Sequence, residues 1–280
     1  MNSKSTSPAK APAVEESFIE LGGQRLFCRR LIPGRLAPTP GPTLVFLHEA
    51  LGCTAMWHGF PAQVATDTGR PAIVYDRAGY GRSSRMPDRP RDKAYLHREA
   101  EIVLPQLLTR LGLDQALLIG HSDGGSIALL AAAACPEKVA GIVTEAAHVF
   151  VESITRQGIR EALASYEPQG LEKRLARYHG ERTRGLFGAW ADTWLSAAFR
   201  DWNIEDCLGR IRCPALIIQG LEDQYGSPRQ VEAIVAGIGP LATPLFIPGC
   251  GHIPHREDPG RVRGAIAKFV AACCSPTIND

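Results

Sequence analysis

The sequence lacks a strong charge of either sign, a long apolar run and a recognisable signal segment. Its 280 residues carry 31 Lys and Arg against 29 Asp and Glu, a formal net charge of +2. This balance gives no electrostatic footprint for nucleic acid or for an anionic membrane surface. No apolar run is long enough to span a bilayer. The first residues, MNSKSTSPAKAPAVEES, lack the apolar core of a secretory signal. We therefore expect neither a nucleic-acid partner nor a membrane partner.

Paired cysteines are also missing, because no two of the eight cysteines form a C-x-x-C motif or a zinc spacing. A chain of this length does not need disulfides, so we expect free thiols and a cytoplasmic location. His252 and His255 have no third ligand cluster near them, which argues against a metal. The scattered cysteines are Cys28, Cys53, Cys135, Cys207, Cys213, Cys250, Cys273 and Cys274.

The composition that is present, 45% hydrophobic and 21% charged, is typical of a globular protein. Residues 1–14 are rich in Ser, Pro, Ala and Lys and are predicted to form a disordered tail. Residues 15–146 and 206–280 are predicted to form the core of an α/β domain. The interval 147–205 contains helical segments and no convincing strand, and we interpret it as a helical cap.

Short apolar runs followed by polar or glycine residues recur along the predicted core. Such runs suit strands that are buried on both faces, as in a parallel sheet. Helical patterns alternate with them, which predicts an α/β fold with a mostly parallel sheet between helices. Gly22-Gly23 predicts an additional hairpin before the first run. The runs are Thr43–Leu47, Ala72–Tyr75, Ala116–Ile119, Val139–Thr144, Ala215–Ile218 and Pro244–Ile247.

The predicted helices differ in the arrangement of their apolar residues. Between Arg98 and Leu111, Ile102 and Leu107 lie at helical spacing, and Pro105 predicts a kink. Ser126–Ala134 is apolar on every side, so that helix should be buried. The last helix is expected to start at Asp258-Pro259, an N-cap followed by proline.

The strongest chemical signal is Gly120-His121-Ser122-Asp123-Gly124, a G-x-S-x-G pattern between an apolar strand and an apolar helix. A serine in such a sharp turn needs neighbours without side chains, because a Cβ atom there would clash with the backbone. Ser122 is therefore predicted to be a nucleophile. The alternative is an ordinary glycine-rich turn.

A serine hydroxyl needs a base to accept its proton, and the base needs a carboxylate to orient it. His252 lies in a glycine-rich loop after the last strand and is the predicted base, with His255 expected on the surface or in a supporting position. Asp223, in QGLEDQYG, is the predicted acid. Glu222 and Glu145 remain alternatives for that role.

Two backbone N–H groups are predicted to stabilise the oxyanion, those of Ala50 and Asp123. We hypothesise that the Glu49 or Asp123 carboxylate contacts a polar or cationic substrate group or positions water. The alternative is that both carboxylates point to the surface or form salt bridges. Further candidates for the substrate pocket are His48, Glu49, His148, Trp194 and Tyr225.

The order Ser, Asp, His, together with GHSDGG, YDRAGYGRS, GLED and CGH before a proline-capped helix, resembles the α/β-hydrolase superfamily from about Phe18 to Ala272. The resemblance implies a triad of Ser122, Asp223 and His252, a cap inserted after Glu145, and no cofactor. Superfamily members that are haloalkane dehalogenases or epoxide hydrolases use aspartate as nucleophile, so a serine argues against both activities.

We therefore predict a serine hydrolase that cleaves a carboxylic ester, a lactone or a thioester of a small to medium molecule. One alternative is hydrolysis of a carbon–carbon bond in a ring-cleavage product, and another is a slow-turnover, hydrolase-like receptor. The sequence does not specify the substrate. It also leaves open whether the protein forms a homodimer.

Overall fold

The computed structural model describes residues 11–34, 41–86 and 91–273. The first described elements are the strands β1 (Ala13–Leu21) and β2 (Gln24–Ile32), which form a hairpin, as Gly22-Gly23 predicts. The predicted tail of residues 1–14 is two residues too long, because Ala13 pairs with Ile32 and continues the ladder of the hairpin. Residues 1–10 of that tail lie outside the described part of the chain.

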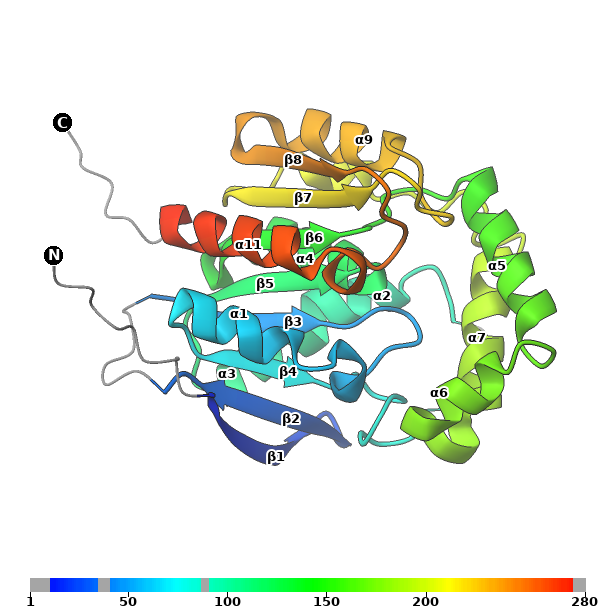
Figure 1. Ribbon diagram of the computed structural model, residues 1–280, viewed down its shortest axis with the longest axis horizontal. Helices are drawn as coiled ribbons and strands as arrows, with labels where there is room; N and C mark the ends of the chain where they lie inside the picture. The colour runs from blue at the N-terminus through cyan, green and yellow to red at the C-terminus, as the bar shows by residue number, and fades with distance from the viewer. Residues whose placement is uncertain (1–10, 35–40, 87–90, 274–280) are drawn as a thin grey trace, which may run out of the picture.

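A single eight-stranded sheet forms the centre of the molecule, in the order β1-β2-β4-β3-β5-β6-β7-β8 (Figure 1). The strands from β3 to β8 are parallel, whereas β2 runs antiparallel to both of its neighbours. Because the strands are parallel, their carboxyl ends meet at one edge, facing the helices α5–α7. All six predicted runs are strands: β3 (Thr43–Leu47), β4 (Ala72–Tyr75), β5 (Ala116–His121), β6 (Val139–Glu145), β7 (Ala215–Gly220) and β8 (Ala242–Ile247).

Helices cover both faces of the sheet. Alternate residues of a strand face opposite layers, so Val45 packs with the layer of α4 while Phe46 packs with the layer of α1 and α11. Both faces of the sheet are therefore shielded from water, which explains why the strand sequences are continuously apolar. The core helices are α1 (Phe60–Thr68), α2 (Tyr95–Arg98), α3 (Leu104–Arg110), α4 (Asp123–Ala134), α8 (Glu205–Leu208), α9 (Arg229–Ile238), α10 (Pro254–Glu257) and α11 (Pro259–Cys273).

Short turns of other helix types complete the connections. Among the described residues, four of them are 3₁₀ turns and one is a π-helical turn. They are Thr54–Trp57, Pro136–Lys138, Gly180–Arg182 and Gly239–Leu241 (3₁₀) and Glu99–Val103 (π).

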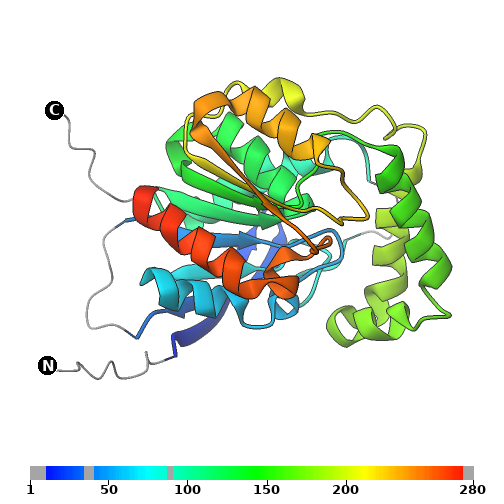
Figure 2. The same ribbon diagram turned by 45° about the horizontal axis from the view of Figure 1, so that its top comes forward.

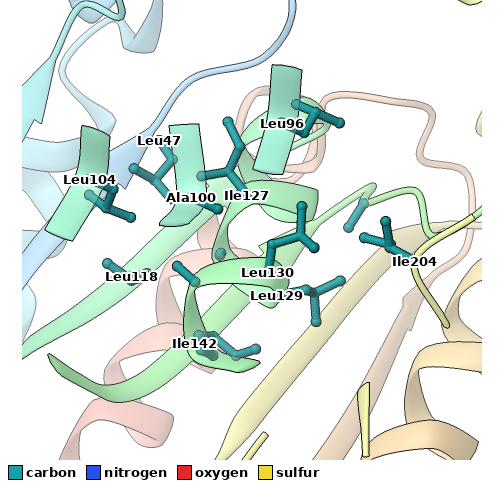
Figure 3. Close-up of a cluster of buried hydrophobic side chains, with 14 of the residues drawn as sticks. Leu47, Leu96, Ala100, Leu104, Leu118, Ile127, Leu129, Leu130, Ile142 and Ile204 are labelled. Carbon is teal, nitrogen blue, oxygen red and sulfur yellow. The ribbon is translucent and has the colours of Figure 1, made fainter. Parts of the chain in front are cut away.

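Helix α4 lies at the centre of the larger apolar cluster, as its all-apolar sequence predicts. Figure 3 shows Leu129 and Leu130 of this helix beside Leu118 of β5 and Ile142 of β6. The prediction for the preceding helix is wrong at Ile102, which is 51% exposed. The π-helical turn Glu99–Val103 contains it, and the wider turn rotates the side chain away from the buried stripe.

The cap consists of α5 (Ser153–Ser165), α6 (Leu171–His179) and α7 (Thr183–Leu195). The three helices fall within the predicted interval 147–205 and stand over the carboxyl edge of the sheet, apart from the helices of the core (Figures 1 and 2). Its two stems are joined by a β-bridge between Phe150 and Asn203 and by the Ile204 N–H, which donates to the Val149 carbonyl at 2.8 Å. The cap is therefore tied at its base, where the chain leaves and re-enters the core.

No helix within the described residues is long and apolar enough to span a bilayer. Within the same residues, no group of three or more His, Cys, Asp or Glu side chains is placed to hold a metal ion. The cysteines with free thiols include Cys28, Cys53, Cys135, Cys207, Cys213 and Cys250.

Candidate active site

Ser122 occupies a strained turn between β5 and α4. Its backbone has φ +53° and ψ −117°, a conformation that residues with a Cβ rarely adopt. A Cβ on Gly120 would lie 2.1 Å from the Gly124 carbonyl oxygen, and a Cβ on Gly124 would lie 1.9 Å from the Leu47 carbonyl oxygen. Only glycine fits at either position, which gives the G-x-S-x-G pattern its physical reason. The turn is held by the Ser122 N–H, which donates to the Glu145 carbonyl at 2.8 Å.

The structure brings Ser122, His252 and Asp223 into one hydrogen-bonded row. The Ser122 hydroxyl lies 3.1 Å from His252 Nε2, and His252 Nδ1 lies 2.9 Å from each Asp223 carboxylate oxygen. With the proton on Nδ1 directed at the carboxylate, Nε2 is free to accept the serine proton. The three residues come from the ends of β5, β7 and β8, which lie along the same edge of the sheet.

Asp223 is held as a carboxylate by its surroundings. Its side chain accepts hydrogen bonds from the Gln219 amide at 2.7 Å and from the Tyr225 backbone N–H at 2.8 Å. Burial alone would raise the pKa of this carboxyl, but His252 and the Tyr225 N–H outweigh burial and keep the pKa below its ordinary value. A carboxylate at this point is placed to orient the imidazole of His252 through Nδ1.

The alternative acids, Glu222 and Glu145, and the second histidine, His255, lie outside this hydrogen-bonded row. Glu222 is exposed to solvent. Glu145 is fully buried, and its carboxylate lies 3.0 Å from His255 Nδ1, not at His252. His255 is also buried, packed against Trp57 with ring centroids 4.7 Å apart, so of the two positions expected for it the surface one is wrong and the supporting one remains. A second buried carboxylate–histidine pair therefore lies beneath the candidate site.

Ala50 and Asp123, whose backbone N–H groups are the expected oxyanion donors, line the cavity that contains Ser122. Neither donates a hydrogen bond within the described residues, and the Asp123 N–H belongs to the first residue of α4, where backbone donors have no partner in the helix. Arg77 braces the Ala50 loop, because its guanidinium donates to the Glu49 carbonyl at 2.9 Å. The site thus has two backbone donors that are free to receive a developing negative charge.

The two carboxylates beside these donors are engaged by protein groups. Asp123 accepts a hydrogen bond from the Tyr95 hydroxyl at 3.0 Å and pairs with Arg77 at 3.5 Å. The Glu49 carboxylate lies 3.6 Å from Nδ1 of His121. Burial would raise the pKa of Glu49 and lower that of His121, but each partner reverses the direction for the other. The structure therefore favours the salt-bridged alternative over a free carboxylate for the substrate.

A cavity of about 230 Å³ opens above Ser122. Its floor belongs to the core. From the cap it is lined by Thr155, whose hydroxyl donates to the Tyr225 carbonyl at 2.6 Å, and by five apolar side chains: Ile159, Leu171, Leu175, Trp190 and Trp194. Of the predicted pocket residues, Glu49, His148, Trp194 and Tyr225 line the cavity.

His48 does not line the cavity, and that part of the prediction is wrong. Its side chain is fully buried against Tyr80, with ring centroids 4.8 Å apart, and Nδ1–H donates to the Glu49 carbonyl at 2.7 Å. His48 therefore shapes the backbone of the loop that carries Ala50.

Several residues at the site were not singled out by sequence reasoning. His121 lies inside the G-x-S-x-G motif, and its Nε2–H donates to the His252 carbonyl at 2.7 Å. Arg77 lies within the quoted segment YDRAGYGRS, which was the available signal for a role near the site. For the cap residues Ile159, Leu171 and Leu175 no signal was available, because an apolar residue at helical spacing is equally typical of simple packing.

The fold and the strained serine turn define the class of this protein, the α/β-hydrolase fold. The chain belongs to the alpha/beta hydrolase family, whose family model matches residues 44–265. Several relatives have the names of hydrolytic enzymes, which supports a hydrolase, while others are named as a synthase and as an acetyltransferase component.

Among curated relatives, a proline iminopeptidase of Lactobacillus delbrueckii subsp. lactis is 34% identical over 117 residues, 42% of this chain and 38% of that protein. The human serine hydrolase BPHL is 30% identical over 160 residues, 54% of this chain and 53% of that protein. The chain therefore spans well under two thirds of the length of either relative. The solved structure of an enol-lactonase from Burkholderia xenovorans LB400 superimposes with a TM-score of 0.71 at 16% identity, covering 91% of this chain and all of that one. At that identity the likeness shows the fold alone.

Proposed function

We propose that the protein is a serine hydrolase that cleaves a carboxylic ester of a small, largely apolar molecule, including internal esters such as lactones. One observation carries the proposal. Ser122 lies in a hydrogen-bonded row with His252 and Asp223, beside two unengaged N–H groups and beneath a cavity. Acyl transfer requires a nucleophile, a base that accepts its proton and N–H donors for the oxyanion, and these residues can supply all three.

In the proposed reaction, Ser122 Oγ attacks the ester carbonyl carbon while its proton passes to His252 Nε2. The carbonyl oxygen becomes an oxyanion that accepts hydrogen bonds from the Ala50 and Asp123 N–H groups. The tetrahedral intermediate collapses, and the leaving alkoxide takes the proton from His252. Water then attacks the acyl-enzyme with His252 again as base, which releases the acid and restores the Ser122 hydroxyl.

The cavity supports a small and uncharged acyl group. Its volume of about 230 Å³ lies below the range of roughly 300–1,000 Å³ that is usual for drug-sized ligands. Its cap side is mostly apolar, and the carboxylates of Glu49 and Asp123 already face His121 and Arg77. Burial lowers the pKa of His148, so this imidazole is neutral at pH 7. A charged substrate group would therefore find no unpaired partner among these residues.

The first experiment is labelling with a fluorophosphonate, which is attacked by an activated serine with loss of fluoride. We expect one adduct per molecule on the peptide that contains Ser122, and no adduct in Ser122→Ala. The same variant should lose about 10⁶-fold in kcat on an ester, because the covalent route is removed. Failure of the folded wild-type protein to label would overturn the proposal.

A substrate panel then tests the class of bond and the charge. We expect p-nitrophenyl acetate and butyrate to be hydrolysed with higher kcat/KM than a p-nitrophenyl ester with a carboxylate on its acyl chain. Prolyl p-nitroanilide, chosen because one relative is named a proline iminopeptidase, is expected to be a poor substrate. Its free ammonium group would need an unpaired carboxylate. Faster cleavage of the prolyl amide than of any ester would contradict the proposed substrate class.

A further inference from the structure

His121 is a buried histidine that the proposed reaction does not use, although it precedes the nucleophile in sequence. Its side chain is only 2% exposed. The Nε2–H donates to the backbone carbonyl of His252 at 2.7 Å, whereas Nδ1 has no hydrogen-bond partner among the described side chains and backbone. A histidine that donates through one nitrogen and faces a carboxylate with the other is suited to carry both protons.

The carboxylate that faces Nδ1 belongs to Glu49, at 3.6 Å. The chain makes room for it, because a Cβ on Gly52 would lie 2.2 Å from Glu49 Oε2. The Gly52 N–H also closes the turn by donating to the Glu49 carbonyl at 3.1 Å. The carboxylate is thus folded back over its own loop toward His121, and a quarter of its surface remains exposed at the cavity.

The pair touches each of the three segments that must meet for acyl transfer. Glu49 is bonded to Ala50, the expected oxyanion donor. His121 is bonded to Ser122, the expected nucleophile, and it also holds the carbonyl of His252, the expected base. The rings of His121 and His252 lie 5.1 Å apart. A rigid contact at this junction fixes the separation of nucleophile, base and donor, and rates of acyl transfer depend steeply on that separation.

We propose that Glu49 and His121 are positioning residues: their ion pair holds the Ala50 loop, the Ser122 turn and the His252 loop in register. The inference rests on the proposed function of Ser122. It assigns no contact with substrate to either residue. In this proposal the Glu49 carboxylate contacts His121 and does not bind the substrate, in contrast to the hypothesis drawn from the sequence.

The test is a double-mutant cycle with Glu49→Gln, His121→Gln and the double variant. The first measurement is the rate of fluorophosphonate labelling of Ser122. The second is kcat and KM for a neutral and for a cationic p-nitrophenyl ester. We expect each single variant to lose about 10–100-fold in labelling rate and in kcat, with KM within about twofold. The double variant should lose little more than the worse single variant, because the two residues act as a unit.

Asp67→Asn is the matched control, since Asp67 has a similar exposed fraction and pairs with Arg263 at 2.7 Å away from the cavity. It should leave every rate unchanged. All rates are expressed per folded molecule, from circular dichroism and thermal unfolding. If Glu49→Gln does not fold, Glu49→Asp gives the same readout, because it keeps the charge but shortens the reach by one methylene.

The outcomes separate the two proposals. Unchanged rates per folded molecule in the variants, with normal labelling of the wild-type protein, would overturn the positioning role. A change in KM confined to the cationic ester would also overturn it, since that result identifies Glu49 as a substrate ligand. Additive losses in the cycle would show that the two residues act separately and would likewise overturn it. Absence of labelling in the wild-type protein would instead overturn the proposed function itself.

Discussion

The two sides of the cavity are built in different ways. On the core side, polar groups at strand ends are fixed by short hydrogen bonds, as Asp223 is by Gln219 and His252. On the cap side, most of the lining residues, such as Ile159 and Leu171, are apolar and come from separate helices, and Thr155 is the polar exception. Hydrogen bonds fix positions to within fractions of an ångström, whereas apolar contacts define a shape. The comparison suggests that the core carries the chemistry and the cap selects the substrate.

Among variants that keep Ser122, the largest expected effect lies on the core side, at Asp223. Asp223→Asn should leave the shape of the site intact but should lower kcat by about 10⁴-fold. An amide that donates to Nδ1 would hold the wrong tautomer of His252. Steady-state kinetics on p-nitrophenyl butyrate would measure the loss, and KM should change by less than about threefold.

The adjacent carboxylate provides the control for this experiment. Glu222 is exposed and makes no contact with His252, so Glu222→Gln should keep wild-type kcat. A comparable loss in both variants would mean that the loop tolerates neither change. In that case the division between a chemical core and a selective cap would lose its main support.

The core side is also the part that the sequence predicts well. The short apolar runs of β3–β7 are buried almost completely, whereas the edge strand β8 is partly exposed. Polar residues follow directly at several strand ends, as His48 follows β3 and Asp76 follows β4. The strict glycine requirement at Gly120 and Gly124 made the serine turn recognisable. These signals are local, because a strand, a sharp turn and a following helix are encoded within a few residues.

What the sequence could not predict depends on contacts between distant segments. His48 was expected at the pocket, but only its packing against Tyr80 reveals that it faces inward. The reach of His121 to the His252 carbonyl spans 131 positions along the chain. In the cap, helical spacing predicts which helices have apolar residues but not which of these residues face the cavity. In α5, for example, Ile159 is buried whereas Leu163 is exposed.

A smaller effect is expected on the cap side, at Leu171. This residue is half-buried in α6 and lines the cavity, so Leu171→Ala should enlarge the space for the acyl chain. We expect the ratio of kcat/KM for p-nitrophenyl hexanoate to that for the acetate to rise about tenfold, since one or two methylenes are worth about 1–3 kcal/mol. The labelling rate with a short-chain fluorophosphonate should stay within about twofold.

Leu163→Ala is the control, because Leu163 is 41% exposed and points away from the cavity. It should change neither the chain-length preference nor the labelling rate. An unchanged preference in Leu171→Ala would indicate that the cap does not set substrate size. A large fall in the labelling rate would indicate that the cap contributes to the chemistry, which would erase the distinction between the two sides.

The smallest effect concerns a contact that joins the two sides, made by His179 at the end of α6. Its Nε2–H donates to the Leu51 carbonyl at 2.9 Å, and its Nδ1 accepts the Gly81 N–H at 3.2 Å. Burial lowers the pKa of this imidazole, and the nearby Arg182 lowers it further, although the Leu51 carbonyl opposes both. The neutral form is therefore required, because a proton on Nδ1 would face the Gly81 donor.

The sign of the pH dependence follows from this lowered pKa. When the folded pKa lies below the unfolded value of about 6.5, the unfolded chain takes up the proton first, so stability is lost as pH falls below about 6.5. The slope for one such group is at most about 1.4 kcal/mol per pH unit. Between pH 7.5 and 5.5, the free energy of unfolding from urea titrations should therefore fall by about 1 kcal/mol more in the wild-type protein than in His179→Gln.

Hydrogen exchange locates the change at the contact itself. Protection of the Gly81 amide, corrected for intrinsic exchange, should fall severalfold over the same pH range as its acceptor is protonated. The Ser83 amide in the same loop donates to the Tyr80 carbonyl at 2.9 Å, an acceptor that does not titrate, and should keep its protection. Equal losses at both amides would mean that the whole loop opens with acid. The effect of pH would then extend beyond the His179 contact to other contacts between the cap and the core, such as that of the Arg182 guanidinium with the Ser83 carbonyl at 3.0 Å.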